Sequence, residues 1–431
     1  MKTEFTADQL DQPPIAEANE ILRACVHCGF CLSSCPTYAL TGDELDSPRG
    51  RIYLIKNMLE GGGPPDADTV HHIDRCLSCM SCLTACPSGV DYMHLVDTAR
   101  GHIQTHHRRS IVDRLMRWLM ATILPRPGVF RAALIMAKPA QMFRGILPNT
   151  VGRLTEFAPN KIPPSGSLVG IHRPDGPPVK RIAMLAGCVQ SVLGGGINEA
   201  TIRLLTRHGC EVIVAPDAGC CGALVQHMGH ENSARSQARA NIQAWSSIDG
   251  GVDAVVVTAS GCGTTVKDYG HMFADDPDMA QAAASIAAIA KDVTEIMAEL
   301  GLGVAVPLPD VSVAYHDACS LQHGQGIRAE PRALLEQAGF EVSDIAEGQF
   351  CCGSAGTYNL LQPEMADALG ARKVGHVDAT GAHVVASGNL GCMIQMARFT
   401  ERPMVHTVEL LDWATGGPKP TALEIPRAGV S

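Results

Sequence analysis

The chain has 431 residues, 17 cysteines and a formal net charge of −10. This length leaves room for two or three domains, and the acidic balance argues against a nucleic-acid partner. An odd number of cysteines in a long chain favours metal ligands in a reducing compartment over a disulfide scaffold. The N-terminus is polar and lacks the apolar region of a signal peptide. No stretch of about twenty residues is apolar enough to span a bilayer. We therefore expect a cytoplasmic protein.

Residues 1–24 are expected to form a helix that leads into the first of two cysteine runs. The first run holds Cys25, Cys28, Cys31 and Cys35 before Pro36, and the second holds Cys76, Cys79, Cys82 and Cys86 before Pro87. Both follow C-x2-C-x2-C-x3-C-P, the spacing of ferredoxins with two [4Fe–4S] clusters, in which the fourth cysteine of each run ligates the other cluster.

This spacing predicts two cluster sites. One cluster takes Cys25, Cys28, Cys31 and Cys86, and the other takes Cys76, Cys79, Cys82 and Cys35. Zinc is the alternative for paired C-x2-C units, but a zinc site needs no third closely spaced cysteine. Clusters of this kind pass single electrons, so the pattern predicts an electron-transfer protein.

Two further helices complete an α-helical ferredoxin-like module over residues 1–104. Pro48 lies near the first turn of a helix expected over 52–60, and the Gly-Gly-Gly-Pro-Pro sequence at 61–65 ends it. Another helix is expected over 88–104, after the second cysteine run.

Residues 105–158 form a basic amphipathic segment. Its positive residues are Arg108, Arg109, Arg114, Arg117, Arg126, Arg131, Lys138, Arg144 and Arg153. Apolar groups lie between them, and Pro125 and Pro127 interrupt the pattern. We expect a helical hairpin packed on the rest of the fold, with its arginines exposed or paired with acidic groups. The alternative is a helix on an anionic membrane surface, which would make the protein peripheral on the inner membrane. A Pro/Gly-rich linker follows over 159–180.

The remainder of the chain contains an internal duplication, with copies over 181–305 and 306–415 and a tail over 416–431. Cys188, the Cys220-Cys221-Gly222 unit and Cys262 recur as Cys319, Cys351-Cys352-Gly353 and Cys392, each about 130 residues later.

Each copy alternates strand and helix patterns. In the first copy the expected strands are 181–186, 210–215 and 253–260, and the helices are 198–209 and 230–246. In the second copy the strands are 311–315, 340–345 and 383–387, and the helices are 330–339 and 363–376. This alternation predicts a parallel α/β sheet in each copy. The fold class is therefore α+β multidomain, an α-helical two-cluster module followed by a duplicated α/β Cys-Cys-Gly region.

Sites in parallel sheets form beyond the carboxyl ends of the strands, where all these cysteines fall. We expect one metal site per copy. The first would use Cys188, Cys220, Cys221 and Cys262, and the second Cys319, Cys351, Cys352 and Cys392. Four thiolates hold a further iron–sulfur cluster or a zinc ion, whereas the alternative is a set of inert buried thiols.

Three polar residues lie near Cys319 in the sequence, and one further cysteine, Cys210, lies outside both sets of four. We expect His316, Asp317 and His323 to make local caps and turns; the alternative is that they tune or protonate a redox site. Cys210 is expected to be an ordinary strand residue. The sequence shows no dinucleotide fingerprint, phosphate-binding loop or Ser-His-Asp pattern, so oxidation of a substrate would occur on a partner.

The chain resembles the iron–sulfur subunits of glycolate oxidase over nearly its whole length. The segments that carry the resemblance are CVHCGFCLSSCPTY (25–38), GDELDSPRGRIYLIKNMLEG (42–61), DRCLSCMSCLTACPSGVDY (74–92) and both Cys-Cys-Gly units. The resemblance implies a complex with two FAD-type flavoprotein subunits that convert glycolate to glyoxylate. Electrons would then pass through the clusters of this chain to a quinone or a similar acceptor.

Related alternatives are an iron–sulfur subunit of a lactate or glycerol-3-phosphate dehydrogenase complex, a heterodisulfide reductase-like protein, or a docking platform that binds zinc. The Cys-Cys-Gly units look like those of heterodisulfide reductases, in which a C-x-x-C closes each unit. Here Cys262 is followed by Gly-Thr-Thr and Cys392 by Met-Ile-Gln. One thiolate is therefore missing per copy, which argues against disulfide reduction.

Overall fold

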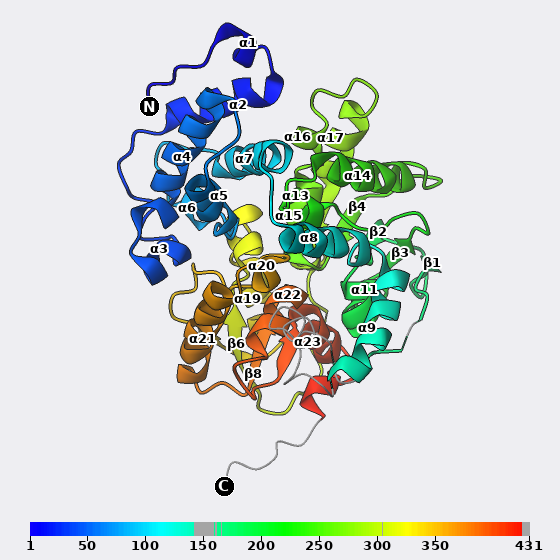
Figure 1. Cartoon of the computed structure of the whole chain (residues 1–431). Coiled ribbons are helices and arrows are strands. Elements are labelled where there is room, and N and C mark those ends of the chain that lie inside the picture. Colours follow the sequence, from blue (N-terminus) through cyan, green and yellow to red (C-terminus); the bar gives the residue numbers. More distant parts are fainter. Residues whose placement is uncertain (142–158, 160–161, 165, 304, 425–431) are drawn as a thin grey trace.

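The computed structural model describes residues 1–141, 159, 162–164, 166–303 and 305–424. An α-helical N-terminal module lies beside the first α/β repeat, and the second α/β repeat lies below both of them in Figure 1. The expected fold class is confirmed, because a helical module precedes two parallel sheets.

The N-terminal module consists of short helices around a small aliphatic core. Its helices are α1 (Ala7–Leu10), α2 (Pro13–Ala24), α3 (Pro36–Thr41), α4 (Pro48–Gly61), α5 (Ala67–Asp74), α6 (Ser81–Thr84) and α7 (Tyr92–His106), with a 3-10 turn, η1, at Glu44–Asp46. The expected leader helix is divided in two, because Pro13 begins a new helix at its first position. Leu22, Ile55 and Leu95 are fully buried where α2, α4 and α7 meet.

The basic segment forms a helical hairpin, as expected. Helix α8 (Ile111–Ile123) packs against α9 (Pro127–Gln141). Arg109 and Arg117 are paired with Asp74 of α5, at 2.6 and 3.3 Å. The hairpin is thus attached to the N-terminal module by ion pairs. The rest of the expected segment, 142–158 with Arg144 and Arg153, lies outside the described residues.

The first repeat contains a five-stranded sheet with the order β1-β3-β2-β4-β5. The strands are β1 (Gly170–His172), β2 (Lys180–Leu185), β3 (Cys210–Val214), β4 (Ala254–Val257) and β5 (Ala290–Asp292). Strands β2 to β5 are parallel, whereas β1 pairs antiparallel with β3. Strand β1 lies inside the expected linker 159–180, so that part of the expectation was wrong: the edge of β3 offers free backbone groups, and β1 satisfies them.

The helices of the first repeat follow its strands closely. They are α11 (Gln190–Leu193), α12 (Gly195–Arg207), α13 (Ala223–Gln226), α14 (Glu231–Ser246), α15 (Ser260–Lys267), α16 (Tyr269–Met272), α17 (Ala280–Ile289) and α18 (Val293–Leu300). The strand expected over 253–260 is shorter in the structure: β4 ends at Val257, and Cys262 lies in the first turn of α15.

The second repeat has a four-stranded parallel sheet with the order β7-β6-β8-β9. Its elements are β6 (Ser312–His316), the π-helix η2 (Ser320–Gly324), α19 (Glu330–Gln337), β7 (Glu341–Asp344), α20 (Tyr358–Leu361), α21 (Pro363–Ala379), β8 (Val384–Ser387), α22 (Leu390–Met396), β9 (Met404–His406), α23 (Thr407–Ala414) and the 3-10 turn η3 (Thr421–Leu423). The order of the parallel strands matches that of the first repeat, which fits the duplication seen in the sequence.

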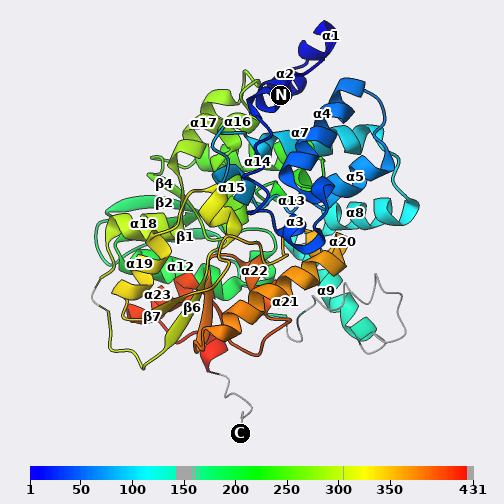
Figure 2. The ribbon, with the colours of Figure 1, turned by 90° about the vertical axis from the view of Figure 1, so that its left-hand side faces the viewer.

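A single core joins the two repeats. Ile182 and Met184 of β2 belong to the same buried cluster as Val313 of β6 and Val384 of β8. Helix α12 packs on α23, and α18 packs on α19, so helices of both repeats fill the space between the sheets. Figure 2 shows these helices between β2 and β6, with α3 of the N-terminal module close to α21.

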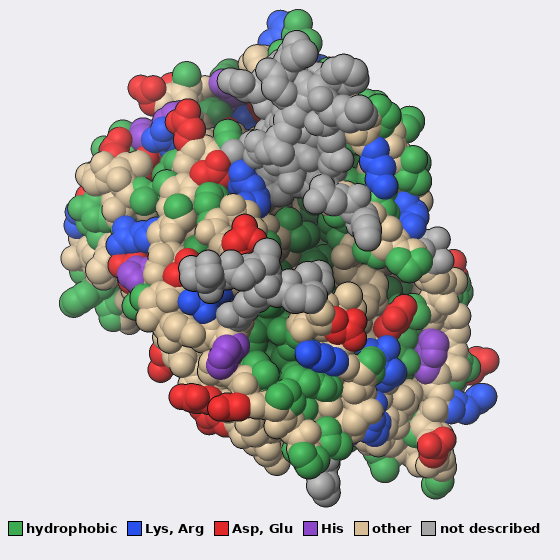
Figure 3. Space-filling view, turned by 90° about the horizontal axis from the view of Figure 1, so that it is seen from below, with side chains coloured by type: hydrophobic (Ala, Val, Ile, Leu, Met, Phe, Trp, Pro, Cys, Tyr) green, Lys and Arg blue, Asp and Glu red, His purple; other side chains and the backbone are tan. Residues whose placement is uncertain are grey.

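On the lower face, drawn in Figure 3, described basic and acidic side chains are interspersed, and hydrophobic side chains gather around a central hollow. Among the described helices, none combines the length and the apolar character needed to cross a bilayer.

Candidate iron–sulfur sites

The two ferredoxin-type cysteine runs fold into similar loops. His27 and Ser78 occupy the same place in each run and both have left-handed φ angles, 55° and 48°. Gly29 and Met80 also correspond and have φ angles of 86° and 60°. Non-glycine residues rarely adopt this conformation. The tight turns let closely spaced thiols face one cavity.

The structure groups these cysteines as the spacing predicts. The cavity beside α4 is lined by Cys25, Cys28, Cys31, Cys82 and Cys86. The neighbouring cavity is lined by Cys35, Cys76, Cys79 and Cys82. The fourth cysteine of each run therefore lies with the first three of the other run. Cys82 lines both cavities, so the two sites are adjacent; the assignment of each thiol as a ligand stays a prediction.

A buried arginine stands beside the second of these cavities. Arg51 of α4 is 1% exposed, and its Nη1 lies 3.9 Å from Cys35 Sγ. The guanidinium donates to Thr37 Oγ1 at 3.0 Å and to the His72 carbonyl at 2.7 Å. Hydrogen bonds and charge near the sulfurs set cluster potentials, so Arg51 is positioned to stabilise the more negative form of a bound cluster.

The segment around Arg51 is built to hold it. Ser47 Oγ accepts the Gly50 N–H at 3.0 Å and caps α4, and Pro48 occupies the first helical turn. Asp46 is fully buried and pairs with Arg51, with His72 at 2.9 Å and with Arg75 at 2.9 Å. In the sequence, this role is signalled only by the closely spaced acidic and basic residues of the GDELDSPRGR segment (42–51).

The four cysteines of the first Cys-Cys-Gly site converge, as expected. Cys188 follows β2, and its Sγ lies 3.5 Å from Cys220 Sγ in the loop after β3. The thiol of Cys221 contacts those of Cys220 and Cys262. All of them lie beyond the carboxyl ends of the strands. Cys210, by contrast, is buried in β3 within the aliphatic core, as expected.

The second Cys-Cys-Gly site repeats this arrangement. Cys319 Sγ lies 3.8 Å from Cys351 Sγ, and the thiol of Cys352 contacts those of Cys351 and Cys392. Contact with Cys319 and with Cys352, together with the Gly353 N–H, lowers the pKa of Cys351.

The backbone conformation and close packing of each Cys-Cys-Gly unit require a glycine at its third position. Gly222 and Gly353 have φ angles of 97° and 87°. A Cβ atom at Gly222 would also meet the backbone of Ala234 on α14, and one at Gly353 would meet the backbone of Ala366 on α21. Only glycine allows the loop both to turn and to pack this closely.

The polar residues near Cys319 do not act only as local caps. His316 is 2% exposed, and one ring nitrogen lies within 4.8 Å of the sulfurs of Cys352 and Cys392. Burial lowers the pKa of His316 to about 3, so its imidazole is neutral. His323 instead contacts Thr84 Oγ1 of the N-terminal module at 2.7 Å. The local expectation was therefore wrong for both histidines, because their partners come from distant segments. Burial raises the pKa of Asp317.

The raised pKa values of the buried thiols imply that they are protonated when no metal is bound. Burial raises the pKa of Cys31 to about 11 and raises the pKa of Cys79 and Cys82 well above the usual range. Several thiolates together in such an environment are costly without a bound cation. Metal binding supplies that cation and releases the protons. The donor set of sulfur in tight groups of four suits iron–sulfur clusters and zinc.

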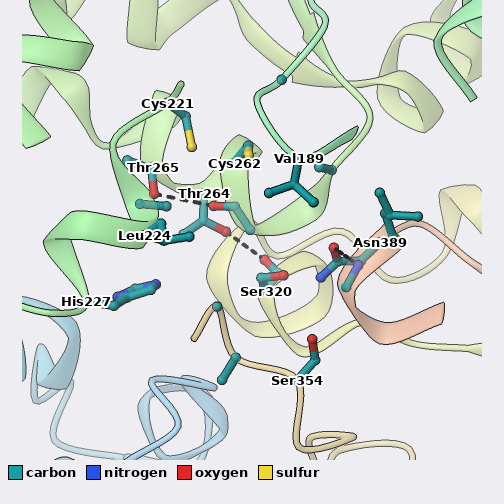
Figure 4. A pocket seen from close by; sticks show the side chains of 18 of the residues that line it. Val189, Cys221, Leu224, His227, Cys262, Thr264, Thr265, Ser320, Ser354 and Asn389 are labelled. Carbon is teal, nitrogen blue, oxygen red and sulfur yellow. Dashed lines mark hydrogen bonds between the residues drawn. The ribbon is translucent and has the colours of Figure 1, made fainter. Parts of the chain in front are cut away.

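A cavity of about 350 Å³ lies where the N-terminal module and the two repeats meet. Cysteines of both Cys-Cys-Gly sites line it, together with Met80 from the second ferredoxin loop. In Figure 4, Cys221 and Cys262 lie together on one side of this pocket, and Thr264 Oγ1 donates to the Ser320 carbonyl at 3.0 Å. The two repeats thus face each other across one space.

This architecture defines an iron–sulfur protein with a two-cluster ferredoxin module and a duplicated cysteine-rich domain. The model of the 4Fe-4S dicluster domain matches residues 24–90. The model of the cysteine-rich domain matches twice, over residues 182–267 and 313–397.

Comparison with curated proteins identifies the particular family. The chain is 38% identical to the glycolate oxidase iron-sulfur subunit of Escherichia coli, over 96% of this chain and 99% of that protein. It is 35% identical to the probable glycolate oxidase iron-sulfur subunit of Bacillus subtilis, over 91% and 94%. Lactate utilization protein A of Shouchella clausii is 25% identical, over 51% of this chain and 92% of that protein. The chain belongs to the family of glycolate oxidase iron–sulfur subunits.

Proposed function

We propose that this chain is the electron-transfer subunit of a complex that oxidises glycolate to glyoxylate. In this proposal two [4Fe–4S] clusters are held by Cys25, Cys28, Cys31 and Cys86 and by Cys76, Cys79, Cys82 and Cys35. Two FAD-type flavoprotein partners carry out the oxidation, and a quinone-type acceptor receives the electrons. Clusters of this type pass single electrons, while the protein sets their positions and potentials.

The thiol groups of different sites lie next to one another, and this observation supports the electron-transfer role most strongly. Cys82 lines both ferredoxin cavities. Cys79 belongs to the same buried cluster as Cys351, and Cys319 of the second repeat packs against that cluster. Both Cys-Cys-Gly sites then share the central cavity. The thiol sites of the N-terminal module therefore adjoin those of the repeats, which supports electron transfer between them.

The exposed end of this series suits a redox partner. Cys28 is exposed in the first loop, and the neighbouring apolar residues Val26 and Phe30 are 67% and 66% exposed. Exposed apolar side chains around a functional group are typical of interaction sites. We assign this loop to the contact with a flavoprotein partner.

Each Cys-Cys-Gly site is proposed to bind a further iron–sulfur cluster or a zinc ion, with Cys188, Cys220, Cys221 and Cys262 in the first site and Cys319, Cys351, Cys352 and Cys392 in the second. The convergence of four buried thiols in each repeat supports this assignment. Iron and zinc analysis of anaerobically purified protein, with Cys221→Ser and Cys352→Ser variants, distinguishes the two metals and tests each site. A metal content unchanged by both substitutions would exclude metal binding there.

A peripheral contact with the inner membrane, from the cytoplasmic side, is proposed for α8. Its exposed apolar residues are Ile111, Val112, Leu115 and Trp118, and the basic residues Arg108 and Arg114 lie in the same segment. Apolar groups with nearby cations suit an anionic lipid surface. The expected result is salt-sensitive binding to vesicles that contain anionic lipid, weakened by Trp118→Glu. If the protein does not bind at low salt, the exposed face is an ordinary protein interface.

The proposed role is tested on the complex purified with its partners under anaerobic conditions. We expect glycolate-dependent reduction of a dye by the wild type and loss of that activity, with loss of iron, in Cys28→Ser and Cys79→Ser. Cys210→Ala is the matched control, because Cys210 lies in the core of β3 away from every site. Full activity in variants that have lost their clusters would refute the electron-transfer role.

Lactate oxidation is the second candidate, since the chain also matches lactate utilization protein A over about half its length. The same assay with lactate or glycerol 3-phosphate in place of glycolate separates these substrates. If lactate or glycerol 3-phosphate is turned over faster than glycolate, that compound replaces glycolate as the proposed substrate.

A further inference from the structure

The two repeats differ at one corresponding pair of strand residues. In the first repeat Leu185 of β2 pairs with Val257 of β4 at the carboxyl ends of the strands. In the second repeat the same register position pairs His316 of β6 with Ser387 of β8. An apolar pair is thus replaced by a polar pair directly below the second Cys-Cys-Gly site. This substitution is costly in a buried sheet unless the imidazole has a partner.

One nitrogen of His316 has such a partner and the other does not. Nδ1 lies 3.1 Å from Ser387 Oγ, whereas Nε2 is buried and has no hydrogen-bond partner among the described residues. A ring nitrogen of His316 and the sulfurs of Cys352 and Cys392 all lie within 4.8 Å of one another. When Nδ1–H donates to Ser387, Nε2 keeps a free lone pair, which is the usual state of a metal-bound histidine.

A second difference between the repeats places a basic side chain near the second site. Ala234 and Ala366 correspond, because each packs on the glycine of its Cys-Cys-Gly unit. Two helical turns after these alanines, the first repeat has Asn241 and the second has Lys373. Asn241 Nδ2 donates to the Cys220 carbonyl at 2.9 Å. Lys373 Nζ donates to the Glu347 carbonyl at 2.6 Å, and burial lowers the pKa of this ammonium group.

We propose that His316 Nε2 is a ligand of the metal group in the second Cys-Cys-Gly site, oriented by Ser387 and accompanied by the positive charge of Lys373. The second site is therefore a mixed imidazole and thiolate site, whereas the first uses thiolates alone. This inference rests on the proposal that the second repeat binds metal.

The unequal ligands make the two sites unequal in redox terms if both hold iron. His316 adds a neutral imidazole to the four thiolates, so the second site gains a ligand without gaining negative charge. A lysine nearby raises the reduction potential of an iron centre, because it stabilises added negative charge. The second site, which also adjoins the ferredoxin loop through Cys79 and Cys351, thus attracts electrons more strongly than the first.

The test uses the full-length protein, purified anaerobically from cells supplied with histidine carrying ¹⁵N in its ring. Wild type is compared with His316→Leu, which copies Leu185 of the first repeat, and with His316→Cys, which offers a thiolate instead. His323→Asn is the matched control, since His323 is buried in the same repeat but contacts Thr84 and the Gln349 carbonyl. Pulsed electron paramagnetic resonance detects a nitrogen bonded to iron, and zinc-edge X-ray absorption detects one bonded to zinc.

We expect a directly bonded histidine nitrogen in wild type and in His323→Asn, and its loss in both His316 variants. His316→Cys should keep the metal, and in an iron site it should titrate at a lower potential than wild type. The inference is overturned if wild type shows no bonded nitrogen, a result that does not depend on any variant folding. It is equally overturned if the nitrogen signal persists in a folded His316→Leu protein.

The ferredoxin-type signals and the glycolate-dependent activity report on the proposed function separately. Their retention without a nitrogen signal rejects only the histidine ligand. Their loss in wild type, with the nitrogen signal still present, rejects the glycolate role and leaves the ligand assignment standing.

Discussion

Thr84 Oγ1 and His323 Nδ1 lie 2.7 Å apart, although 239 positions separate them in the chain. Thr84 belongs to the second ferredoxin loop, between Cys82 and Cys86, and His323 lies in η2 just after Cys319. The other ring nitrogen of His323 contacts the Gln349 carbonyl at 3.2 Å. One imidazole therefore connects the ferredoxin loop with two loops of the second Cys-Cys-Gly site.

This connection predicts that Thr84→Val destabilises the junction. Loss of a partly buried hydrogen bond lowers the free energy of unfolding by about 1 kcal/mol. Urea titrations of Thr84→Val, His323→Leu and the double variant measure the coupling between the two side chains. Independent, additive effects of the two substitutions would show that the contact contributes nothing.

Removal of the Arg51 guanidinium should be more costly. Arg51→Met leaves Asp46 buried with fewer positive partners, and breaking a buried ion pair from one side costs about 3–5 kcal/mol. We expect a lower unfolding temperature and partial loss of iron, measured by calorimetry and by metal analysis. Arg23→Met is the control, because Arg23 is exposed on α2 of the same module and such substitutions change stability by less than about 0.5 kcal/mol. Equal behaviour of the two variants would contradict a role for Arg51.

The contact between the N-terminal module and the first repeat should weaken at high pH. Burial opposes protonation of His94, but hydrogen bonds to Asp268 at 3.0 Å and to Asp91 at 2.8 Å outweigh it and raise the pKa of His94 to about 10. Because the folded-state pKa lies above the ordinary value of 6.5, the stabilisation is fully present below pH 6.5 and is lost as the pH rises through 10.

Thermal unfolding between pH 6 and pH 10 measures this effect. Wild type should lose stability toward the alkaline end, and His94→Gln should lose less, since glutamine has no charge to titrate. A pH profile of His94→Gln that parallels the wild type would assign the loss to other groups.

Removal of iron should loosen the N-terminal module first. Without metal, the buried thiols of Cys79 and Cys82 are protonated because burial raises their pKa, and the cavities they line lose their contents. Amide hydrogen exchange should therefore increase in α4 and α5 after anaerobic chelation. The β2 and β6 strands, which share one aliphatic core, should stay protected. Uniform loss of protection over the whole chain would show instead that the metal stabilises the entire fold.

Local spacing was enough to predict the ferredoxin loops and the order of strands and helices. The x2 gaps between Cys25, Cys28 and Cys31 force a tight loop that turns several thiols to one side. The expected strand at 210–215 appears as β3 because its apolar run and flanking helices depend only on nearby residues. Short edge elements such as β1 and β9 escaped prediction, because a three-residue strand exists only through its neighbour.

The sequence by itself determined which thiols are available and that the cysteine-rich unit occurs twice, because spacing and repetition can be read directly along the chain. Tertiary structure decided which groups meet: the pairing of β6 with β8 placed His316 against Ser387 below the second site, and packing of the module placed Cys79 beside Cys351. These relationships depend on contacts between segments that are distant along the chain. Only the packing of the whole molecule brings such segments together.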